Sequence, residues 1–571
     1  MNKLYEKYFR DKRNCDILYI IGFVGILLLF IYKAPLEIQG QDEAFYLTIP
    51  KRLLDGDVFI FDEWHGSQLS ALILYPIMAL HNLFFSNEGI VLHFRYIYIF
   101  FQALCAAVIY IRLRSYKLFG AIASWLFFLF TPYDILALSY NTMGIMLMTL
   151  SGVIAATAKS KKAYFASGLL FAGAVLCCPY LLAAYIIFTL ATIIVAVVKK
   201  DKKIVLSWLF FTLGSVLLAA VLAVFILTRV SVSDFFAALP NIFDDPEHVS
   251  KSLFAGIRGY FRAIRTAFQW GIIYIVVYLL DIVLIIIDKR RYEHRVAYLA
   301  VSVVIAICML AEFAFYLDTK TYNYIMFPLM PVGLVAFLVT KNKNWRVFAH
   351  LLVGGFLYTM CVYFSSNQAF YIISSMSVVA DVGAVALIHD ALLEEKYRKV
   401  PCGEKTNFTV GYAIVLAVLL IQFPLMTYTK VTHKFWSHVE NSQLTVEISE
   451  GVYKGIKVTP TTKTEYITAL SALKTIDADE GDRILYASDT VWYYLQTDEL
   501  KIGAYSAWLS GENVTTINRL DKYYTLNPEN IPDIIYVDLT NDWPQAAFSE
   551  FLSKYGFTLV SAGGANIYSR G

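Results

Sequence analysis

Apolar runs of bilayer length recur through the first three quarters of the chain and constrain its fold more than any other feature. A helix needs about 17–25 apolar residues to cross a bilayer. Helices are the commonest structure there because they satisfy every backbone N–H and C=O group with internal hydrogen bonds. We therefore predict a polytopic α-helical membrane protein. Its 13 expected transmembrane helices, several of them short or nearly fused, lie at 17–33, 92–111, 118–132, 142–158, 164–178, 180–198, 204–228, 268–287, 296–316, 324–340, 346–364, 370–389 and 408–427.

The composition agrees with a membrane protein. The 571 residues are 58% hydrophobic and 16% charged, whereas soluble proteins are about 45–50% apolar and about 25% charged. The net charge of +3 gives no indication of nucleic-acid binding, and no nucleic-acid partner is expected. The first apolar run lacks a small-residue cleavage site, which favours a retained span over a signal peptide.

Lysine and arginine residues mark every second loop, and this alternation predicts the orientation of the chain. The N-terminus is basic, and basic residues recur near 112–117, 159–162, 199–203, 289–295, 341–346 and 396–405. We expect these segments in the cytoplasm, with the C-terminus outside. The expected domains are a transmembrane domain, 1–429, with outside loops at 34–91 and 229–267, and an extracytoplasmic domain, 430–571.

The C-terminal region changes character from apolar to mixed. Strand-like runs at 483–487, 534–538 and 557–561 alternate with helical patterns at 462–476 and 545–555. Such alternation is typical of a small α/β domain. No cysteine follows Cys402, so disulfides are not expected to hold this domain together.

Two adjacent acids, Asp42 and Glu43, open the first outside loop about eight residues after the first span. One interpretation is a helix start, where an acidic side chain can cap the first N–H groups and interacts favourably with the positive end of the helix dipole. The other is a general base with a neighbour that positions it. The same loop continues with polar residues that we expect near its surface: Arg52, Asp62, Glu63, His65 and Gln68. Of these, Arg52, His65 and Gln68 are the candidates for binding substrate.

Asp134 lies in a short loop, "TPYD", on the same predicted side as Asp42. Pro132 followed by an acid is also a helix-start pattern. Because two outside carboxylates at loops of one bundle can converge, we expect Asp134 to share a pocket with Asp42 and to be a catalytic residue.

Three arginines, Arg258, Arg262 and Arg265, are spaced four and three residues apart, which places them on one helix face. They lie in a predicted outside loop, where arginine is uncommon. They fit either an in-plane amphipathic helix that binds lipid headgroups or a clamp for a lipid phosphate. In both cases the partner is an anionic lipid.

A later outside turn, "YLDTKTYNYIMFPLMP", supplies Lys320, Tyr322 and Tyr324 as candidate phosphate or sugar ligands. A snorkelling lysine with interfacial tyrosines would give the same pattern. Glu312, near the outside end of its span, is a further candidate for the pocket. The sequence contains no Walker loop, serine nucleophile elbow or HExxH motif, so the energy for a reaction would arrive with a membrane-borne substrate or gradient.

These features together resemble the polyprenyl-phosphate-dependent glycosyltransferases of the GT-C superfamily. The resemblance rests on the first span, the Asp42-Glu43 loop, "WHGSQLSALILYPIMAL" and then Arg95, which begins the next span and is counted among the substrate-binding candidates. By pattern the chain is similar to protein O-mannosyltransferases and to the bacterial aminoarabinose transferase of lipid A. One departure concerns Ser67 to Ser70, which replace a Lys-Pro-Pro-Leu motif often found in the aminoarabinose branch.

The resemblance implies transfer of a sugar from a polyprenyl-phosphate donor, with inversion, and Asp42 as the base. Glu43 and Asp134 would orient the acceptor or hold a divalent ion such as Mg²⁺ or Mn²⁺, although no metal site is indicated by the residues themselves. Arg258, Arg262, Arg265 and Lys320 would bind the donor phosphate. The acceptor would be a glycolipid, a cell-wall polymer or a protein, and the bilayer a bacterial plasma membrane.

Two other classes of protein remain open from the sequence. A transporter or flippase for a lipid-linked or anionic solute would also contain many spans and intramembrane acids. A polysaccharide polymerase or ligase would account for arginines in a large outside loop. Neither explains the acid pair directly after the first span.

Overall fold

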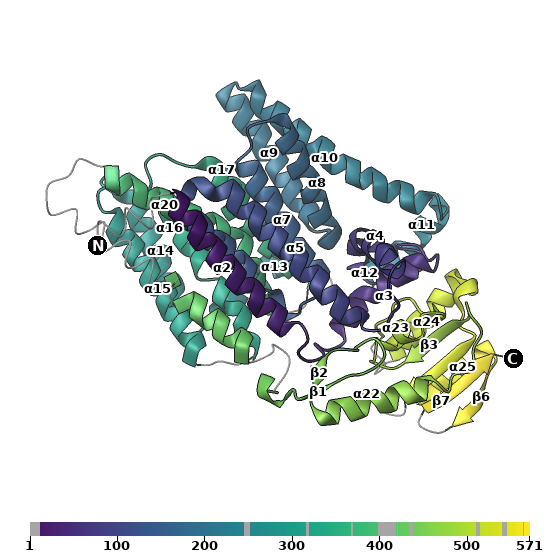
Figure 1. The fold of residues 1–571 in the computed structure, drawn as a ribbon. Coiled ribbons are helices and arrows are strands. Elements are labelled where there is room, and N and C mark those ends of the chain that lie inside the picture. Colours follow the sequence, from purple (N-terminus) through teal and green to yellow (C-terminus); the bar gives the residue numbers. More distant parts are fainter. Residues whose placement is uncertain are drawn as a thin grey trace.

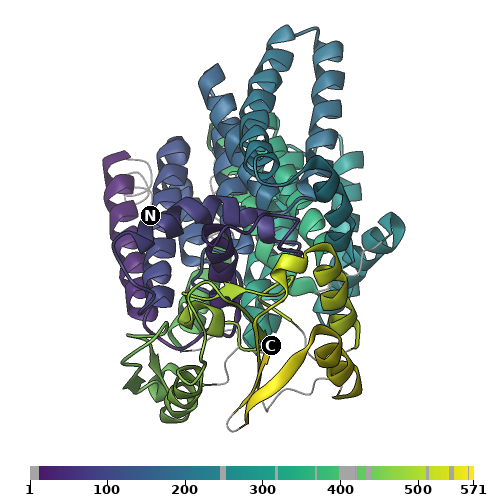
Figure 2. The ribbon, with the colours of Figure 1, turned by 90° about the vertical axis from the view of Figure 1, so that its right-hand side faces the viewer.

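The computed structural model describes residues 12–244, 252–315, 319–366, 369–397, 418–419, 421–432, 439–509, 514–538, 545–562 and 565–570. A bundle of long helices carries a small domain with a β-sheet at one end (Figures 1 and 2). The fold is therefore that of a polytopic helical membrane protein with a C-terminal sheet domain, as predicted.

The long helices coincide with the predicted spans. They are α2 (Lys12–Lys33), α5 (Ile90–Leu113), α6 (Leu118–Leu129), α7 (Tyr140–Ala156), α8 (Lys161–Cys177), α9 (Leu181–Lys199), α10 (Lys202–Leu227), α14 (Gly271–Ile287), α15 (Arg295–Phe315), α16 (Leu329–Val339), α18 (Gly354–Ser365) and α20 (Val378–Tyr397). Within the described residues, seven helices are long and apolar enough to cross a membrane, or up to nine if each bent pair is one span. The count of thirteen stays a prediction, and most of the last run, 408–427, lies outside the described residues.

Shorter helices connect these spans. They are α3 (Asp42–Leu54), η2 (Gln68–Ser70), α4 (Ala71–Asn82), η3 (Arg114–Tyr116), η4 (Pro132–Asp134), α11 (Val232–Ala238), α12 (Pro240–Phe243), α13 (Leu253–Ala267), η5 (Thr319–Met326), α17 (Trp345–Val347), the π-helix η6 (Phe348–Val353) and α19 (Phe370–Met376). Helix α13 meets α14 at 110°. This angle fits an α13 that lies along the membrane surface beside a spanning α14.

Glycines allow helices α8 and α10 to pack with their backbones in contact. A Cβ atom on Gly168 would lie 1.8 Å from the carbonyl oxygen of Phe211, and one on Gly214 would lie 2.0 Å from that of Phe165. Small residues at such a crossing maximise dispersion contacts where the hydrophobic effect between helices is absent.

The C-terminal domain contains a five-stranded sheet with the order β4-β3-β5-β7-β6. Strand β3 (Arg483–Ala487) pairs in parallel with β4 (Lys501–Ile502) and β5 (Ile534–Asp538), whereas β7 (Ala565–Arg570) is antiparallel to both β5 and β6 (Phe557–Ala562). The remaining elements are β1 (Val446–Glu447), β2 (Lys457–Val458), η7 (Asn441–Gln443), α22 (Pro460–Leu473), α23 (Tyr493–Gln496), α24 (Val514–Leu526), η8 (Pro528–Asn530) and α25 (Gln545–Tyr555). The predicted strands and helices of this region are confirmed.

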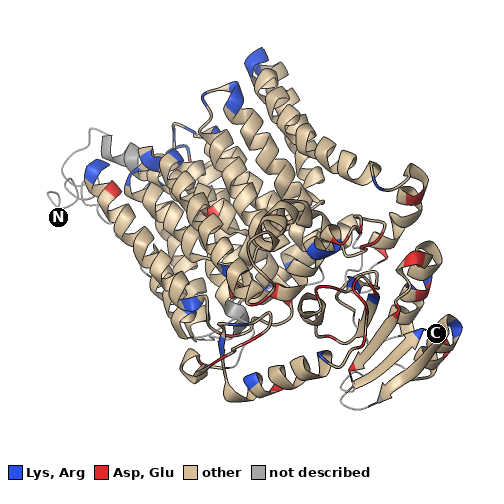
Figure 3. Ribbon diagram, turned by 45° about the vertical axis from the view of Figure 1, so that its right-hand side comes forward, with Lys and Arg blue, Asp and Glu red and all other residues tan. Residues whose placement is uncertain are grey.

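The segment between α2 and α5 joins the bundle to this domain through backbone hydrogen bonds. Trp64 donates to the carbonyl of Tyr505 at 2.8 Å, Lys457 to that of Pro35 at 2.6 Å, and Gly89 to that of Gly451 at 2.9 Å. Several lysines and arginines of the short loops lie at the opposite end of the bundle (Figure 3). The orientation of the chain in the membrane stays a prediction.

Candidate active site

A cavity of about 290 Å³ lies at the end of the bundle that faces the C-terminal domain. Its wall comes from the start of α3, the segment before η2, the η4 loop, the turn after α8, helix α12 and the segment from α18 to α19. The polar lining includes Asp42, Tyr46, His65, Ser67, Gln68, Tyr133, Tyr140, Asn141, Ser365 and Ser366. Segments distant in sequence thus combine one carboxylate, one imidazole and several neutral hydroxyl and amide groups.

Asp42 is the first residue of α3 and the one acid among the described lining residues. Tyr46, one turn later, donates a hydrogen bond to its Oδ1 at 3.0 Å. Burial raises the pKa of Asp42 to about 6, a rise to which the neighbouring charge of Glu43 adds and which the Tyr46 hydrogen bond opposes. A carboxylate with this pKa is ionised at neutral pH and accepts a proton readily.

Glu43 points away from the cavity into a buried ion pair with Arg95. Arg95 Nε donates to Glu43 Oε2 and Nη2 to Oε1, both at 2.7 Å, while Nη1 donates to the carbonyl of Ala34 at 2.6 Å. Arg95 therefore ties the end of α2 to the first turn of α3. Neither residue is part of the cavity lining. Their ion pair instead fixes the first turn of α3, which carries Asp42.

Asp134 was expected to share a pocket with Asp42, but its side chain turns to the other side of the η4 loop. There it forms buried ion pairs with Lys33 at the end of α2 and with Lys430, the latter at 2.7 Å. The adjacent Tyr133 lines the cavity instead. Tyr133 and Asp134 both have positive φ angles, 58° and 56°, a conformation that is uncommon outside glycine, and it sends these neighbouring side chains in different directions.

His65 and Gln68, which the sequence suggested as substrate-binding residues, line the cavity, and their role in binding stays a prediction. The main-chain N–H of Ser67 donates to His65 Nδ1 at 3.2 Å, and the Ser67 hydroxyl lies 2.7 Å from the same nitrogen. Gln68 stabilises its own loop, because its Oε1 accepts from the Ile60 N–H at 2.6 Å and its Nε2 donates to the Glu63 carbonyl at 2.7 Å.

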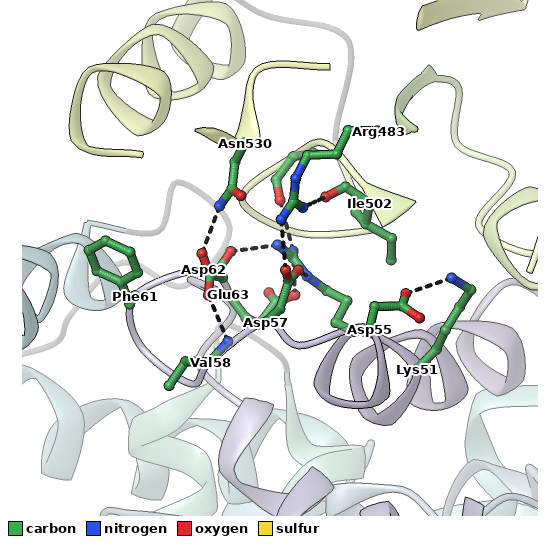
Figure 4. A network of polar contacts seen from close by, with 12 residues as sticks. Lys51, Asp55, Asp57, Val58, Phe61, Asp62, Glu63, Arg483, Ile502 and Asn530 are labelled. Atoms are coloured by element: carbon green, nitrogen blue, oxygen red, sulfur yellow. Dashed lines mark hydrogen bonds and ion pairs between the residues drawn. The ribbon is translucent and has the colours of Figure 1, made fainter. Parts of the chain in front are cut away.

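The expectation that Arg52 and its acidic neighbours lie near the loop surface is wrong. Arg52 is 1% exposed and donates to Asp57 Oδ2 at 2.8 Å, to Glu63 Oε2 at 3.0 Å and to the carbonyl of Ala504 at 2.8 Å. Asp57 also pairs with Arg483, and Asp62 with Asn530, as Figure 4 shows. The C-terminal domain covers this part of the loop, so Arg52 joins the two domains and does not line the cavity.

The later tyrosines and Glu312 also lie outside the cavity lining. Tyr322 stacks on Phe130 with ring centroids 5.6 Å apart, and Tyr324 packs edge-on against Phe370 at 4.8 Å. Glu312 accepts a hydrogen bond from the backbone of Gln269 at 2.8 Å, where it holds the bend between α13 and α14. The side chain of Lys320 lies outside the described residues.

Arg258, Arg262 and Arg265 are all exposed and lie on one face of α13, as their spacing predicted. The opposite face packs on α18, where a Cβ on Gly256 would lie 2.0 Å from Phe364 and one on Gly259 would lie 2.7 Å from the Tyr363 hydroxyl. The arginines therefore lie on a helix adjacent to the cavity wall but are not part of its described lining.

Sequence reasoning missed Tyr46, Tyr133, Tyr140 and Asn141. Tyr46 had a local signal, because it follows Asp42 by four residues and would share its helix face. Tyr133, Tyr140 and Asn141 had no local sequence signal, since they reach the cavity only through the packing of η4 and α7 against α3. Among the described residues, no group of three or more His, Cys, Asp or Glu side chains could hold a metal ion, and a divalent ion stays a prediction.

No protein-family model matches the sequence, and no curated protein matches it. Among solved structures, the chain is similar to ArnT from Cupriavidus metallidurans bound to undecaprenyl phosphate. The identity is 11% and the TM-score 0.45, over 96% of this chain and 98% of that chain. The apo form of the same ArnT aligns at 11% identity with a TM-score of 0.39, over 97% of this chain and 98% of that chain. ArnT belongs to the family that the sequence resembles.

Proposed function

We propose that this protein is a membrane glycosyltransferase that moves a sugar from a polyprenyl-phosphate donor to an acceptor hydroxyl, with inversion. The observation that carries the proposal is the placement of Asp42. A buried carboxylate with a pKa of about 6 lines a 290 Å³ cavity at the end of a membrane bundle. Such a site can bind a sugar and deprotonate a hydroxyl that enters from the aqueous side.

In the proposed reaction, the acceptor oxygen forms a bond to the anomeric carbon as the bond from that carbon to the phosphate oxygen breaks. The hydroxyl proton passes to Asp42, and the electron pair of the broken bond leaves on the phosphate. Attack from the face opposite the leaving phosphate inverts the anomeric carbon. The neutral hydroxyl and amide groups of the lining, Tyr46, Tyr133, Tyr140 and Asn141, suit hydrogen bonds to sugar hydroxyls.

Glu43 and Asp134 act in this proposal as positioning residues. The Glu43–Arg95 pair holds the first turn of α3, and the ion pairs of Asp134 hold the η4 loop that presents Tyr133. Both effects fix the geometry around Asp42, and preorganised geometry lowers the barrier to reaction.

The arginines of α13 would attract the lipid phosphate at the membrane surface. Exposed apolar side chains on the same helix, Phe254 and Phe261, favour an in-plane position between headgroups and acyl chains. The proposal places the cavity and the C-terminal domain outside the cytoplasm of a bacterial cell, where the acceptor is a glycolipid, a cell-wall polymer or a protein.

The test uses purified protein in nanodiscs with a panel of polyprenyl-phosphate sugars and measures which donor is consumed. Asp42→Asn removes the base and preserves size, so we expect turnover to fall by about 10²–10⁴-fold while thermal unfolding stays near that of the wild type.

The matched control is Asp201→Asn, at the start of α10 in the loop between α9 and α10. Asp201 caps that helix by accepting from the Lys203 N–H at 2.9 Å, and asparagine caps equally well. Retained turnover in Asp42→Asn would contradict the role of Asp42. Absence of turnover with every donor in the wild type would favour a transporter.

A further inference from the structure

Helix α3 carries Asp42 and is attached to the rest of the molecule on two sides. On one side, the ion pair of Glu43 with Arg95 ties its first turn to α5. On the other side, α23 of the C-terminal domain packs against the helix (Figure 1). The positions of these two attachments around the helix decide the direction in which Asp42 points.

The C-terminal domain contacts α3 at its start, in its middle and at its end. At the start, the main-chain N–H of Val491 donates a hydrogen bond to Gln41 Oε1 at 3.0 Å. In the middle, Trp508 packs edge-on against Phe45 with ring centroids 5.7 Å apart. At the end, Arg52 donates to a main-chain carbonyl of the same domain at 2.8 Å. The contacts therefore extend along the whole helix.

The residues that make these contacts share one face of α3. Gln41 precedes the helix but has helical backbone angles, φ −84° and ψ −17°. Successive helical residues are about 100° apart, so positions 41, 45 and 52 project within about 40° of one another. Glu43 projects about 200° from Gln41, and Asp42 lies between them at about 100°. Attachments on nearly opposite sides fix the rotation of α3 about its axis, and this rotation directs Asp42 into the cavity.

We propose that the C-terminal domain is part of the active site because it sets the rotation of α3, with Gln41 as the positioning residue next to Asp42. The inference rests on the proposed function and gives the C-terminal domain a role in that reaction. Gln41 does not belong to the described cavity lining and acts through Asp42. Rigid attachment keeps the carboxylate within reach of the acceptor hydroxyl, and a misplacement of about 1 Å can cost about 10²-fold in rate.

The experiment compares Gln41→Met with Gln41→Glu. Methionine is similar in length but lacks the acceptor oxygen for the Val491 N–H, whereas glutamate keeps an oxygen at the position of Oε1. Kinetics are measured at pH 8, above the pKa of Asp42. Gln41→Met should lower kcat about 10–10²-fold and leave the donor KM within about twofold of wild type, because the lining that binds the donor is unchanged. Gln41→Glu should restore kcat to near the wild-type value.

Hydrogen–deuterium exchange provides a readout that does not depend on turnover. The N–H of Phe45 donates to the Gln41 carbonyl at 2.9 Å and is the first such bond within α3. In Gln41→Met, exchange of the main-chain N–H groups from Phe45 onward in α3 should become faster, because this turn loses one of its two attachments. Exchange in α5 and in the C-terminal sheet should keep wild-type rates.

The control Gln545→Met makes the same substitution at an exposed position of α25 and should leave kcat and the exchange of α3 unchanged. The inference fails if Gln41→Met keeps wild-type kcat, even with faster exchange in α3, because the contact then only attaches the domain to the bundle. It also fails if kcat falls equally in Gln41→Met and Gln41→Glu while exchange in α3 is unchanged.

The exchange measurement separates this inference from the proposed function. A wild type that consumes no sugar donor would contradict the transferase, whereas faster exchange of α3 in Gln41→Met would still support the hold of the C-terminal domain on this helix. A wild type that consumes donor, with unchanged kcat and unchanged exchange in Gln41→Met, would support the transferase and overturn the inference.

Discussion

At the residue scale, Asp42 and Glu43 show how adjacent identical charges acquire different roles. Successive residues of a helix point about 100° apart, so only one of the pair can face the cavity. Glu43 faces Arg95 on α5, whereas Asp42 faces the cavity and is partnered by Tyr46. The resemblance to a known family already favoured Asp42 over Glu43 as the base, and the position of Arg95 gives the physical reason why Glu43 does not face the cavity.

The raised pKa of Asp42 predicts a pH dependence of turnover. Asp42 must be ionised to accept a proton, and its pKa is about 6. We expect kcat/KM to be constant near pH 7.5 and, below about pH 6, to fall roughly tenfold per pH unit as the carboxyl is protonated. The measurement is initial donor consumption between pH 4.5 and 8.5, with thermal unfolding recorded at each pH. Constant kcat/KM down to pH 4.5 in folded protein would contradict Asp42 as the base.

At the element scale, the α8–α10 crossing depends on glycine. Gly168→Ala places a Cβ 1.8 Å from the Phe211 carbonyl oxygen, which forces the helices apart, and overpacking of this kind costs about 1–3 kcal/mol. We expect a lower midpoint of thermal unfolding in detergent. Gly25→Ala in α2 is the control, because nothing lies within 4 Å of its added Cβ, and it should leave the midpoint unchanged or raise it. Equal midpoints for both variants would show that the crossing is looser than described.

The joint between the first loop and the C-terminal domain depends on Arg52. Arg52→Met leaves Asp57 and Glu63 as buried acids without this partner, and loss of one member of a buried ion pair costs about 3–5 kcal/mol. We expect a lower unfolding midpoint and faster proteolysis between the bundle and the domain. In the control, Lys474→Met removes an exposed pair with Glu450, which contributes only about 0–1 kcal/mol. A wild-type cleavage rate in Arg52→Met would contradict the role of Arg52 at the joint.

At the scale of the whole molecule, the basic loops and the C-terminal domain lie at opposite ends of the bundle (Figure 3). This arrangement predicts that the cavity opens outside the cytoplasm. The test places single cysteines at exposed positions in a cysteine-free background. Thr464→Cys in α22 should react with an impermeant maleimide in intact cells, and Lys200→Cys in the loop between α9 and α10 should not.

Permeabilised cells are the control for that labelling, because both cysteines should then react. Labelling of Lys200→Cys alone in intact cells would reverse the orientation and place the cavity in the cytoplasm. In that case the donor and acceptor would have to be cytoplasmic, which would contradict the proposed function at the level of the whole molecule.

The sequence by itself determined the elements of the structure. Long apolar runs marked the helices of the bundle, and short strand-like runs between helical patterns marked strands β3, β5 and β6, because both patterns depend on the residues of one local segment. The tertiary structure alone decided which side chains meet. Asp134 turned to Lys33 and Lys430, Arg52 to the C-terminal domain, and Tyr133 to the cavity beside Asp42. These contacts join segments distant along the chain, and no local pattern records the direction in which a side chain points once its helix has packed.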